Sequence, residues 1–263
     1  IGSNNRKIFK KMEFLYEPLI KKGAKFLCTT RKGAELIKYA SNAFLATKIT
    51  FINEIANLCE TAGINVEDIA VGMGADARIG SRFLRAGPAY GGSCFPKDTK
   101  GLVSIADKFK TNLSIVKSVI RSNQNRKILL TKRINKILNN KIKNKRITVL
   151  GVTFKANTDD MRESSSLVLV PYLLKKGATV KYHDPSGPKK EFKLNKNLKF
   201  ERTLSKACEG ADLIIINTEW DEFKSIDFKK VVKKNNFKIY DLRNLYNPKE
   251  LKKRNIKYYS VGR

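Results

Sequence analysis

One cysteine lies where a protein chain can make a thiol reactive. Cys94 occurs in the segment GPAYGGSCFPKDTKGL, after two glycines and before a Lys97-Asp98 pair. Pro96 suits the first turn of a helix and Asp98 suits its positive end, so we expect a helix to begin just after Cys94. A helix N-terminus and a nearby cation both favour the nucleophilic thiolate. Cys94 is therefore a candidate nucleophile. The alternative is a small buried residue at a turn, as most free cysteines are.

A lysine and an asparagine form a second chemical feature. Lys38 and Asn42 lie in GAELIKYASNAFLATKITFINEIANLCETA, whose apolar residues recur at three- and four-residue spacing and predict a helix from Gly33 to Ala62. Side chains four residues apart share one face of a helix. A cation beside an amide can stabilise a substrate oxygen that gains negative charge. The alternative is an exposed lysine beside an asparagine that only packs.

Further cationic side chains occur in loops. Lys155 and Arg162 belong to VTFKANTDDMRESSS, ahead of a helix that we expect to start near Ser164, an arrangement suited to phosphate. Arginines of two other segments could join Lys155 and Arg162 around one ligand. Together these cations suit a doubly negative ligand whose reactive end lies at the cysteine. The groups that could converge on Cys94 are Lys38 with Asn42, Arg78 with Arg85, and Lys155 and Arg162 with Arg243.

The elements that must position these residues fall into three parts. Residues 1–32 predict a helix at about 5–22 and a short strand in KFLCTT, and residues 33–140 predict an all-helical region with one long helix. From residue 146 onward, the β-branched runs RITVLGVTF, ATVKYHD, ADLIIINT and FKIYDLR alternate with helical patterns. This alternation predicts an α/β fold, a doubly wound parallel sheet of Rossmann-like type. The sheet carries no GxGxxG segment, so it is not expected to bind a dinucleotide by itself.

Composition limits the classes of function. The chain has 54 Lys+Arg against 24 Asp+Glu, a net charge of +30, which suggests a nucleic-acid binder. Lysine-rich runs such as NKILNNKIKNKR lack aromatic residues for base stacking, so we expect dispersed surface lysines and no nucleic-acid partner. Scattered cysteines and one histidine, His183, argue against a metal site. No apolar run is long enough to span a bilayer and no secretory start is present, so we expect a cytoplasmic protein without a membrane partner.

Four segments together resemble one enzyme family. They are GAELIKYASNAFLATKITFINEIANLC, GADARIGSRFLRAGPAYGGSCFPKDT, VLGVTFKANTDDMRESSS and YDLRN. With these, nearly the whole chain resembles the UDP-glucose/GDP-mannose dehydrogenase family. The Ser-Cys-Phe-Pro-Lys-Asp run favours the branch that acts on UDP-glucose over the branch that acts on N-acetyl-hexosamines.

The resemblance implies a reaction and a domain organisation. The implied reaction is an NAD-dependent, two-step oxidation of UDP-glucose to UDP-glucuronate, through a cysteine thiohemiacetal and thioester. The implied architecture is an NAD-binding domain, a central helical region for dimerisation and catalysis, and a UDP-sugar-binding domain. Here these correspond to a remnant at 1–32, to 33–140 and to 146–263. The implied homodimer agrees with the helix from Glu35 to Glu60, which is more apolar than one surface stripe requires.

The resemblance also assigns roles to residues. Cys94 matches the nucleophile, and Lys38, Asn42 and Asp98 match the other catalytic positions. Arg78 matches an arginine that reaches the substrate of a neighbouring subunit. The positions matching substrate contacts are Lys38, Asn42, Arg78, Phe83, Leu84, Arg85, Ala86, Gly87, Gly91, Phe154, Lys155 and Arg243, and those matching cofactor contacts are Cys94, Lys97 and Arg162.

One part of the family pattern is missing from the sequence. The family contributes a glycine-rich NAD loop, a threonine and a glutamate from an N-terminal domain, and no segment here matches them. We therefore expect this chain to be the C-terminal portion of a longer enzyme. Two other functions remain open: a UDP-sugar-binding chain without turnover and, favoured only by charge, a basic nucleic-acid binder.

Overall fold

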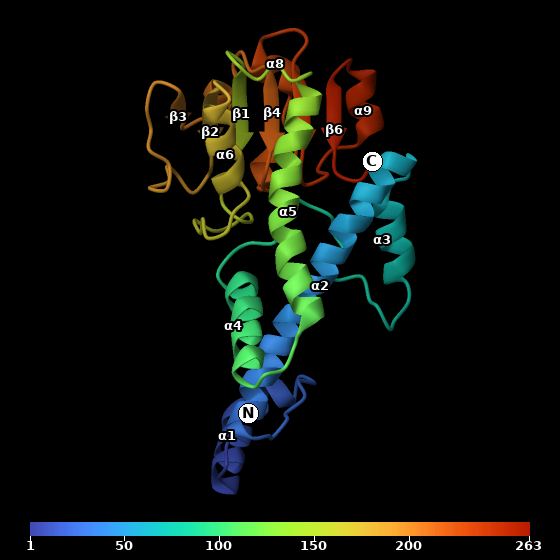
Figure 1. The fold of residues 1–263 in the computed structure, drawn as a ribbon, viewed down its shortest axis with the longest axis vertical. Coiled ribbons are helices and arrows are strands. Elements are labelled where there is room, and N and C mark those ends of the chain that lie inside the picture. Colours follow the sequence, from blue (N-terminus) through green and yellow to red (C-terminus); the bar gives the residue numbers. More distant parts are fainter.

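The molecule is elongated, with a layered sheet at one end and helix α1 at the other (Figure 1). The computed structural model describes residues 1–263. The helices are α1 Arg6–Ile20, α2 Arg31–Ala62, α3 Val66–Gly74, α4 Cys94–Lys108, α5 Ser114–Ile137, α6 Ser166–Lys175, α7 Leu204–Cys208, η1 Asp221–Phe223, α8 Phe228–Val232 and α9 Pro248–Lys253. The strands are β1 Arg146–Leu150, β2 Thr179–His183, β3 Leu198–Phe200, β4 Leu213–Ile216, β5 Lys238–Asp241 and β6 Lys257–Ser260.

The long helix predicted from apolar spacing is present as α2. The side chain of Thr30 caps its first turn by accepting a hydrogen bond from the backbone N–H of Gly33 at 3.1 Å. Gly63 ends the helix in the left-handed conformation, with φ 69°. Asn65 caps the next helix, α3, through its side-chain oxygen. Helix α2 therefore begins and ends, and α3 begins, for local reasons that the sequence already contains.

The sheet confirms the predicted fold class. Its six strands are all parallel, in the order β3-β2-β1-β4-β5-β6. Strands β3 and β6 and helix α9 were not predicted from the sequence. β3 has only three residues, and β6 is the run KYYS, which begins with a lysine at the sheet edge, so neither shows the continuous apolar pattern of a central strand. Long-range pairing, rather than local pattern, makes them strands.

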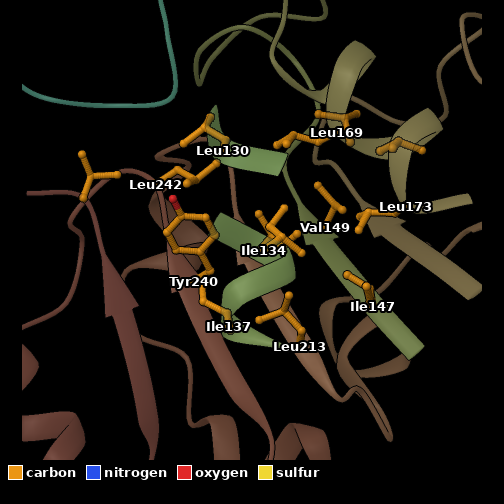
Figure 2. Close-up of a cluster of buried hydrophobic side chains, with 14 of the residues drawn as sticks. Leu130, Ile134, Ile137, Ile147, Val149, Leu169, Leu173, Leu213, Tyr240 and Leu242 are labelled. Atoms are coloured by element: carbon orange, nitrogen blue, oxygen red, sulfur yellow. The ribbon is translucent and has the colours of Figure 1, made fainter. Parts of the chain in front are cut away.

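Each face of the sheet is covered by helices. Ile147, Val149 and Leu213 pack with α5 and α6, whereas Leu150 and Ile214 pack with α7, α8 and α9. Figure 2 shows the first of these two clusters, in which Leu130, Ile134 and Ile137 of α5 lie against β1 and β4. The C-terminal half of α5 is therefore part of the sheet's core, while its N-terminal half runs down beside α2 and α4 (Figure 1). The division of the chain near residue 140 remains a prediction.

The predicted strand in KFLCTT, residues 25–30, is wrong. Thr29 forms only an isolated bridge to Gly2, with hydrogen bonds of 3.0 Å from its N–H to the carbonyl of Ile1 and from the N–H of Ser3 to its own carbonyl. No second pair extends this contact, so the β-branched pattern lacks the neighbouring strand that a ladder needs. The predicted first strand also ends early, at Leu150 rather than Phe154.

The early end of β1 has a steric cause at Gly151. This residue has φ 74°, and a Cβ at its position would lie 1.6 Å from the Thr218 hydroxyl oxygen. Only glycine adopts this turn without strain and without displacing Thr218. The turn directs residues 152–165 across the carboxyl end of the sheet, where doubly wound folds bind their ligands.

Glu163 joins the sheet to the helical region. It lies in the loop between β1 and α6, and its carboxylate accepts hydrogen bonds from Lys100 of α4 at 3.1 Å, from Lys127 of α5 at 2.8 Å and from Gln124 of α5 at 3.2 Å. The hydrogen bond from buried Lys127 contributes most to lowering the pKa of Glu163 to about 2. One carboxylate thus links the loop that follows β1 to two helices.

No helix in the structure is both long and apolar enough to cross a membrane.

We expect Gly151→Ala to lower the free energy of unfolding by about 3 kcal/mol or more, because strain at positive φ adds to a backbone and side-chain clash. Gly187→Ala is the matched control, since Gly187 has φ 88° but nothing within 4 Å of a built Cβ. It should cost about 1 kcal/mol, from backbone strain alone. Urea denaturation of both variants measures the difference, and equal losses would contradict the steric account of the turn.

We expect Glu163→Gln to destabilise the protein at neutral pH but not in acid. The folded pKa of Glu163, about 2, lies below its ordinary value of 4.5. Its stabilisation is therefore fully present above pH 4.5 and is lost as the pH falls towards 2. The gap in unfolding free energy between wild type and variant should narrow over that range, measured by denaturant unfolding at several pH values. Glu191→Gln, which removes an exposed carboxylate without an ion pair, should show no such narrowing. A constant gap for Glu163→Gln would disprove the charge linkage.

Candidate active site

Cys94 is the first residue of α4, as its flanking residues predicted to within one position. Its side chain is exposed, and its Sγ lies 3.7 Å from the Ser93 hydroxyl oxygen. Cys59 and Cys208 are buried, and burial raises the pKa of Cys208 to about 12. Cys28 is exposed but precedes α2 in an irregular segment. Cys94 is thus the cysteine that combines exposure with a helix N-terminus.

A chain of polar contacts connects α2 to α4 beside this cysteine. The Lys38 ammonium donates to Asn42 Oδ1 at 3.4 Å, and Asn42 Nδ2 donates to Asp98 Oδ2 at 2.5 Å. Asp98, one turn after Cys94, also pairs with Lys97 at 2.5 Å. The structure brings the four side chains together, and Lys38 and Asn42 share one helix face as their four-residue spacing predicted. Asn42 and Asp98 are buried, while Lys38 and Lys97 remain exposed.

The electrostatics of this chain favour an ionised Asp98. Burial alone favours its neutral form, but hydrogen bonds from Lys97 and Asn42 outweigh burial and lower the pKa of Asp98. The same contact raises the pKa of Lys97. Lys38 has three N–H donors and the Asn42 amide has two, so donors remain on both after the contacts described. The site therefore offers one carboxylate base and several N–H donors side by side.

The loop before Cys94 lies against the loop that follows β1. A Cβ at Gly91 would be 2.7 Å from the Glu163 carbonyl oxygen and 3.0 Å from the Phe154 Cβ, so only glycine allows this approach. The Gly92 N–H donates to the carbonyl of Arg162 at 2.7 Å. This contact brings Cys94 to the carboxyl end of the sheet, where the sequence placed Phe154 and Arg162.

Residues 83–87 alternate between core and surface. Leu84 and Ala86 are buried in the main hydrophobic cluster, whereas Phe83 and Arg85 are exposed. The side chains of Leu84 and Ala86 therefore face the core, and only their backbone groups are available to a ligand. The alternation anchors the loop while leaving two side chains at the surface.

Arg243, just after β5, lies at the centre of the sheet's carboxyl end. Its Nη2 donates to the Phe154 carbonyl at 2.9 Å, and its Nε lies 2.9 Å from both the Asn217 carbonyl and a Glu219 carboxylate oxygen. Arg85 in turn donates to the Arg243 carbonyl at 2.9 Å. Burial lowers the pKa of Arg243. These contacts hold the guanidinium in one orientation at the switch between β1 and β4.

A hollow of about 640 Å³ lies on the other side of the cysteine loop, between α4, α5 and the start of α6. Ser93, Lys97, Arg162 and Lys127 are among its lining residues, and the side chains of Lys97 and Arg162 are 69% and 67% exposed. Two of the three candidate cofactor contacts, Lys97 and Arg162, thus line one open, cationic hollow, and the third, Cys94, directly follows its lining residue Ser93. The two cations fit the phosphates of a dinucleotide, whereas no glycine-rich turn after β1 provides a site for the rest of it.

Of the predicted site residues, Arg78 lies apart from this cluster, and Lys155 contacts it only through the Phe154 ring. Arg78 lies in the turn after α3, its side chain is 90% exposed, and it pairs with Asp76 at 2.6 Å. Lys155 is exposed, with its ammonium 5.6 Å from the centre of the Phe154 ring. Neither forms a hydrogen bond to another candidate site residue in this chain.

Sequence reasoning missed the residues that support the cysteine loop. Asn123 pairs with both backbone polar groups of Tyr90, at 2.9 Å and 3.0 Å, and Arg126 and Asn53 contact Gly87. A signal was available: on α5, Asn123 and Arg126 share the buried stripe of Val119 and Leu130. Polar residues on an otherwise apolar helix face need buried partners, and the loop supplies them.

Comparison with known proteins identifies relatives of this chain. The UDP-glucose/GDP-mannose dehydrogenase family matches in two regions: its central domain over residues 32–125 and its UDP binding domain over residues 148–248. A UDP-glucose 6-dehydrogenase of Rickettsia typhi is 44% identical, over 100% of this chain and 61% of that protein. One from Rhizobium meliloti is 46% identical, over 96% of this chain and 58% of that protein. The chain therefore spans about three-fifths of the length of these curated relatives.

Solved structures show the same fold. A UDP-glucose dehydrogenase from Pyrobaculum islandicum superposes with a TM-score of 0.86 at 30% identity, over 99% of this chain and 57% of that chain. An NDP-N-acetyl-D-galactosaminuronic acid dehydrogenase from Methanosarcina mazei superposes with a TM-score of 0.77 at 28% identity, over 90% of this chain and 52% of that chain. Because two domains of one family match separate regions and full-chain identity exceeds 40%, this chain belongs to the UDP-glucose/GDP-mannose dehydrogenase family.

Proposed function

We propose that this chain carries the substrate-binding and cysteine-bearing part of an NAD-dependent UDP-glucose 6-dehydrogenase, which oxidises UDP-glucose to UDP-glucuronate. The observation that carries the proposal is the arrangement of Cys94. Its exposed thiol begins a helix whose next turn holds ionised Asp98, and Asp98 contacts Asn42 and, through it, Lys38. A nucleophile, a base and N–H donors in one place suit stepwise oxidation of an alcohol to an acid.

The substrate site extends from this group to the sheet. The loop of residues 83–87 and Gly91 contacts the sugar nucleotide on one side, and Phe154, Lys155 and Arg243 contact it on the other. Arg243 has the fixed orientation and the guanidinium geometry that suit a diphosphate. Arg78, exposed and away from this site, reaches the substrate bound to a second subunit.

The first oxidation converts the C6 alcohol to an aldehyde. Asp98 accepts the hydroxyl proton through a water molecule, because its carboxylate is ionised and buried beside the reacting centre. Free donors on Lys38 and Asn42 stabilise the negative charge that develops on the oxygen. NAD+, when bound, accepts the hydride that leaves C6 in each of the two oxidations.

The second oxidation proceeds on the cysteine. The Cys94 sulfur bonds to the aldehyde carbon and the carbonyl oxygen takes up a proton, which gives a thiohemiacetal. Loss of hydride from this carbon, and of the hydroxyl proton to Asp98, leaves a thioester. Water then adds to the thioester carbon, the carbon–sulfur bond breaks, and the thiol regains its proton as the carboxylate is released. The sugar stays covalently bound between the two oxidations.

This chain's share of the NAD site consists of Cys94, Lys97 and Arg162. The two cations line the open hollow next to the cysteine and suit the phosphates of the dinucleotide. A second candidate function is binding of a UDP-sugar without turnover, which is favoured by the fixed guanidinium of Arg243, because its contacts do not involve Cys94.

Helix α2 supports a homodimer as the assembled form. Its apolar side chains at every seventh position, Ile37, Phe44, Phe51 and Leu58, are 48%, 66%, 46% and 63% exposed. A seven-residue apolar period is the one at which two helices can run along each other. We propose that a second copy of this chain covers the stripe.

We expect Cys94→Ser, made in the full-length protein, to leave UDP-glucose binding nearly unchanged and to lower glucuronate release by about 10³-fold or more. A hydroxyl in this place forms no comparable nucleophile near neutral pH. Calorimetric titration with UDP-glucose and chromatography of products provide the two measurements.

Cys28→Ser, at the other exposed cysteine, is the control and should keep full turnover. A covalent sugar adduct on Cys59, or glucuronate from Cys94→Ser, would refute the assignment. Binding without NADH formation by wild type would favour the second candidate.

We expect Phe51→Glu to convert a dimer into a monomer, because a charge in an apolar helix seam opposes its burial. Light scattering coupled to size exclusion measures the mass. Leu194→Glu is the control, because Leu194 is a similarly exposed apolar residue, at 49%, in the sheet region. A wild-type monomer at working concentrations would contradict the dimer proposal, as would dimers in both variants.

A further inference from the structure

Both backbone polar groups of one loop residue are held by buried side chains. The Gly87 N–H donates to Asn53 Oδ1 of α2 at 2.8 Å. The Gly87 carbonyl accepts two hydrogen bonds from one guanidinium of α5, from Arg126 Nε at 3.1 Å and from Arg126 Nη2 at 3.0 Å. Gly87 therefore cannot move without breaking three hydrogen bonds to two different helices.

Arg126 is an unusual residue to find in this place. It is 4% exposed, and its Nη1 donates to the Asn53 carbonyl at 3.3 Å and to the side chain of Asn57. None of its hydrogen-bond acceptors is a carboxylate, and burial beside Arg133 lowers its pKa to about 10. A buried cation without a paired anion is costly to the folded state, so stability alone does not account for it.

The other side of Gly87 faces the candidate substrate site. A Cβ built on Gly87 would be 3.6 Å from the Leu242 carbonyl oxygen and 3.7 Å from Arg243 Nη1. The neighbouring residue Arg85 donates to the Arg243 carbonyl. The position of Gly87 therefore determines how closely the loop approaches Arg243, and Arg126 determines the position of Gly87.

We propose that Arg126 is a positioning residue that acts through the Gly87 carbonyl to hold the loop at the distance from Arg243 that a UDP-sugar requires. The inference rests on the proposed function of the Arg243 site. Arg126 itself does not touch the substrate. Cys94 and Asp98 are held separately by α4 and its contacts with α2, so the loss of this clamp affects binding more than chemistry.

The test compares Arg126→Lys with Arg133→Lys in the full-length protein. A lysine at 126 keeps the charge but cannot provide two parallel N–H groups to one carbonyl. Arg133 lies two turns further along α5, contacts Asn57 and Glu60, and does not contact the loop, so it is a matched control for lost stability. We expect Arg126→Lys to raise the Kd and KM for UDP-glucose about tenfold or more with a smaller change in kcat. Arg133→Lys should leave both constants unchanged.

A second pair of variants tests the same clamp from α2 and decides the matter if Arg126→Lys does not fold. Asn53→Leu removes the acceptor of the Gly87 N–H and should raise the Kd in the same way, while Asn53→Asp keeps an acceptor and should retain wild-type affinity. Calorimetric titration with UDP-glucose and thermal unfolding are measured for every variant. Wild type that does not bind UDP-glucose would overturn the proposed function itself. Wild type that binds, with unchanged affinity in folded Arg126→Lys or Asn53→Leu, would overturn only the positioning role.

Discussion

Helix α5 is buried in two places at once, and the rest of the architecture depends on this shared packing. Its C-terminal half contributes Leu130 and Ile134 to the core beneath the sheet. Its N-terminal half places Asn123 and Arg126 against the loop that precedes Cys94. A continuous helix is stiff over this length, so the sheet and the cysteine loop hold a defined separation. On the sheet side, two contacts of the loop after β1 complete this junction between the sheet and the helical region. Glu163 binds Lys100 of α4 and Lys127 of α5, and Gly91 of the cysteine loop packs against Glu163 and Phe154.

This junction divides the site into two regions with different supports. The groups suited to chemistry stand on α2 and α4, where Lys38, Asn42 and Asp98 form a chain of contacts. The groups suited to recognition stand on loops that α5 and the sheet position, with Arg243 at their centre. Loops carry recognition well because a rigid scaffold can hold them from several sides. The division explains why a change in one region is expected to affect binding and a change in the other to affect turnover.

Part of the large positive charge of the chain lies at the candidate site. Most lysines are dispersed over the surface, as the absence of aromatic residues in lysine-rich runs indicated. Arg243, by contrast, is held by several acceptors at the carboxyl end of the sheet, and Lys97 and Arg162 line one hollow beside Cys94. Cationic side chains that line a hollow favour anionic ligands. Net charge alone does not distinguish this arrangement from a nucleic-acid surface.

The sequence by itself determined the long helix, the parallel sheet class, the start of α4 to within one residue of Cys94, and the placement of Lys38 and Asn42 on one helix face. These follow from short-range rules, because caps, helix spacing and β-branched runs act over a few residues. Tertiary structure alone decided the edge strands β3 and β6, the failure of residues 25–30 to form a strand, and the clamp of Arg126 on Gly87. Each of these depends on a partner far away in sequence: a neighbouring strand for the first two, and for Arg126 a carbonyl 39 residues distant. A sequence pattern can indicate that a buried arginine needs hydrogen-bond acceptors. Which carbonyl accepts those hydrogen bonds depends on the fold.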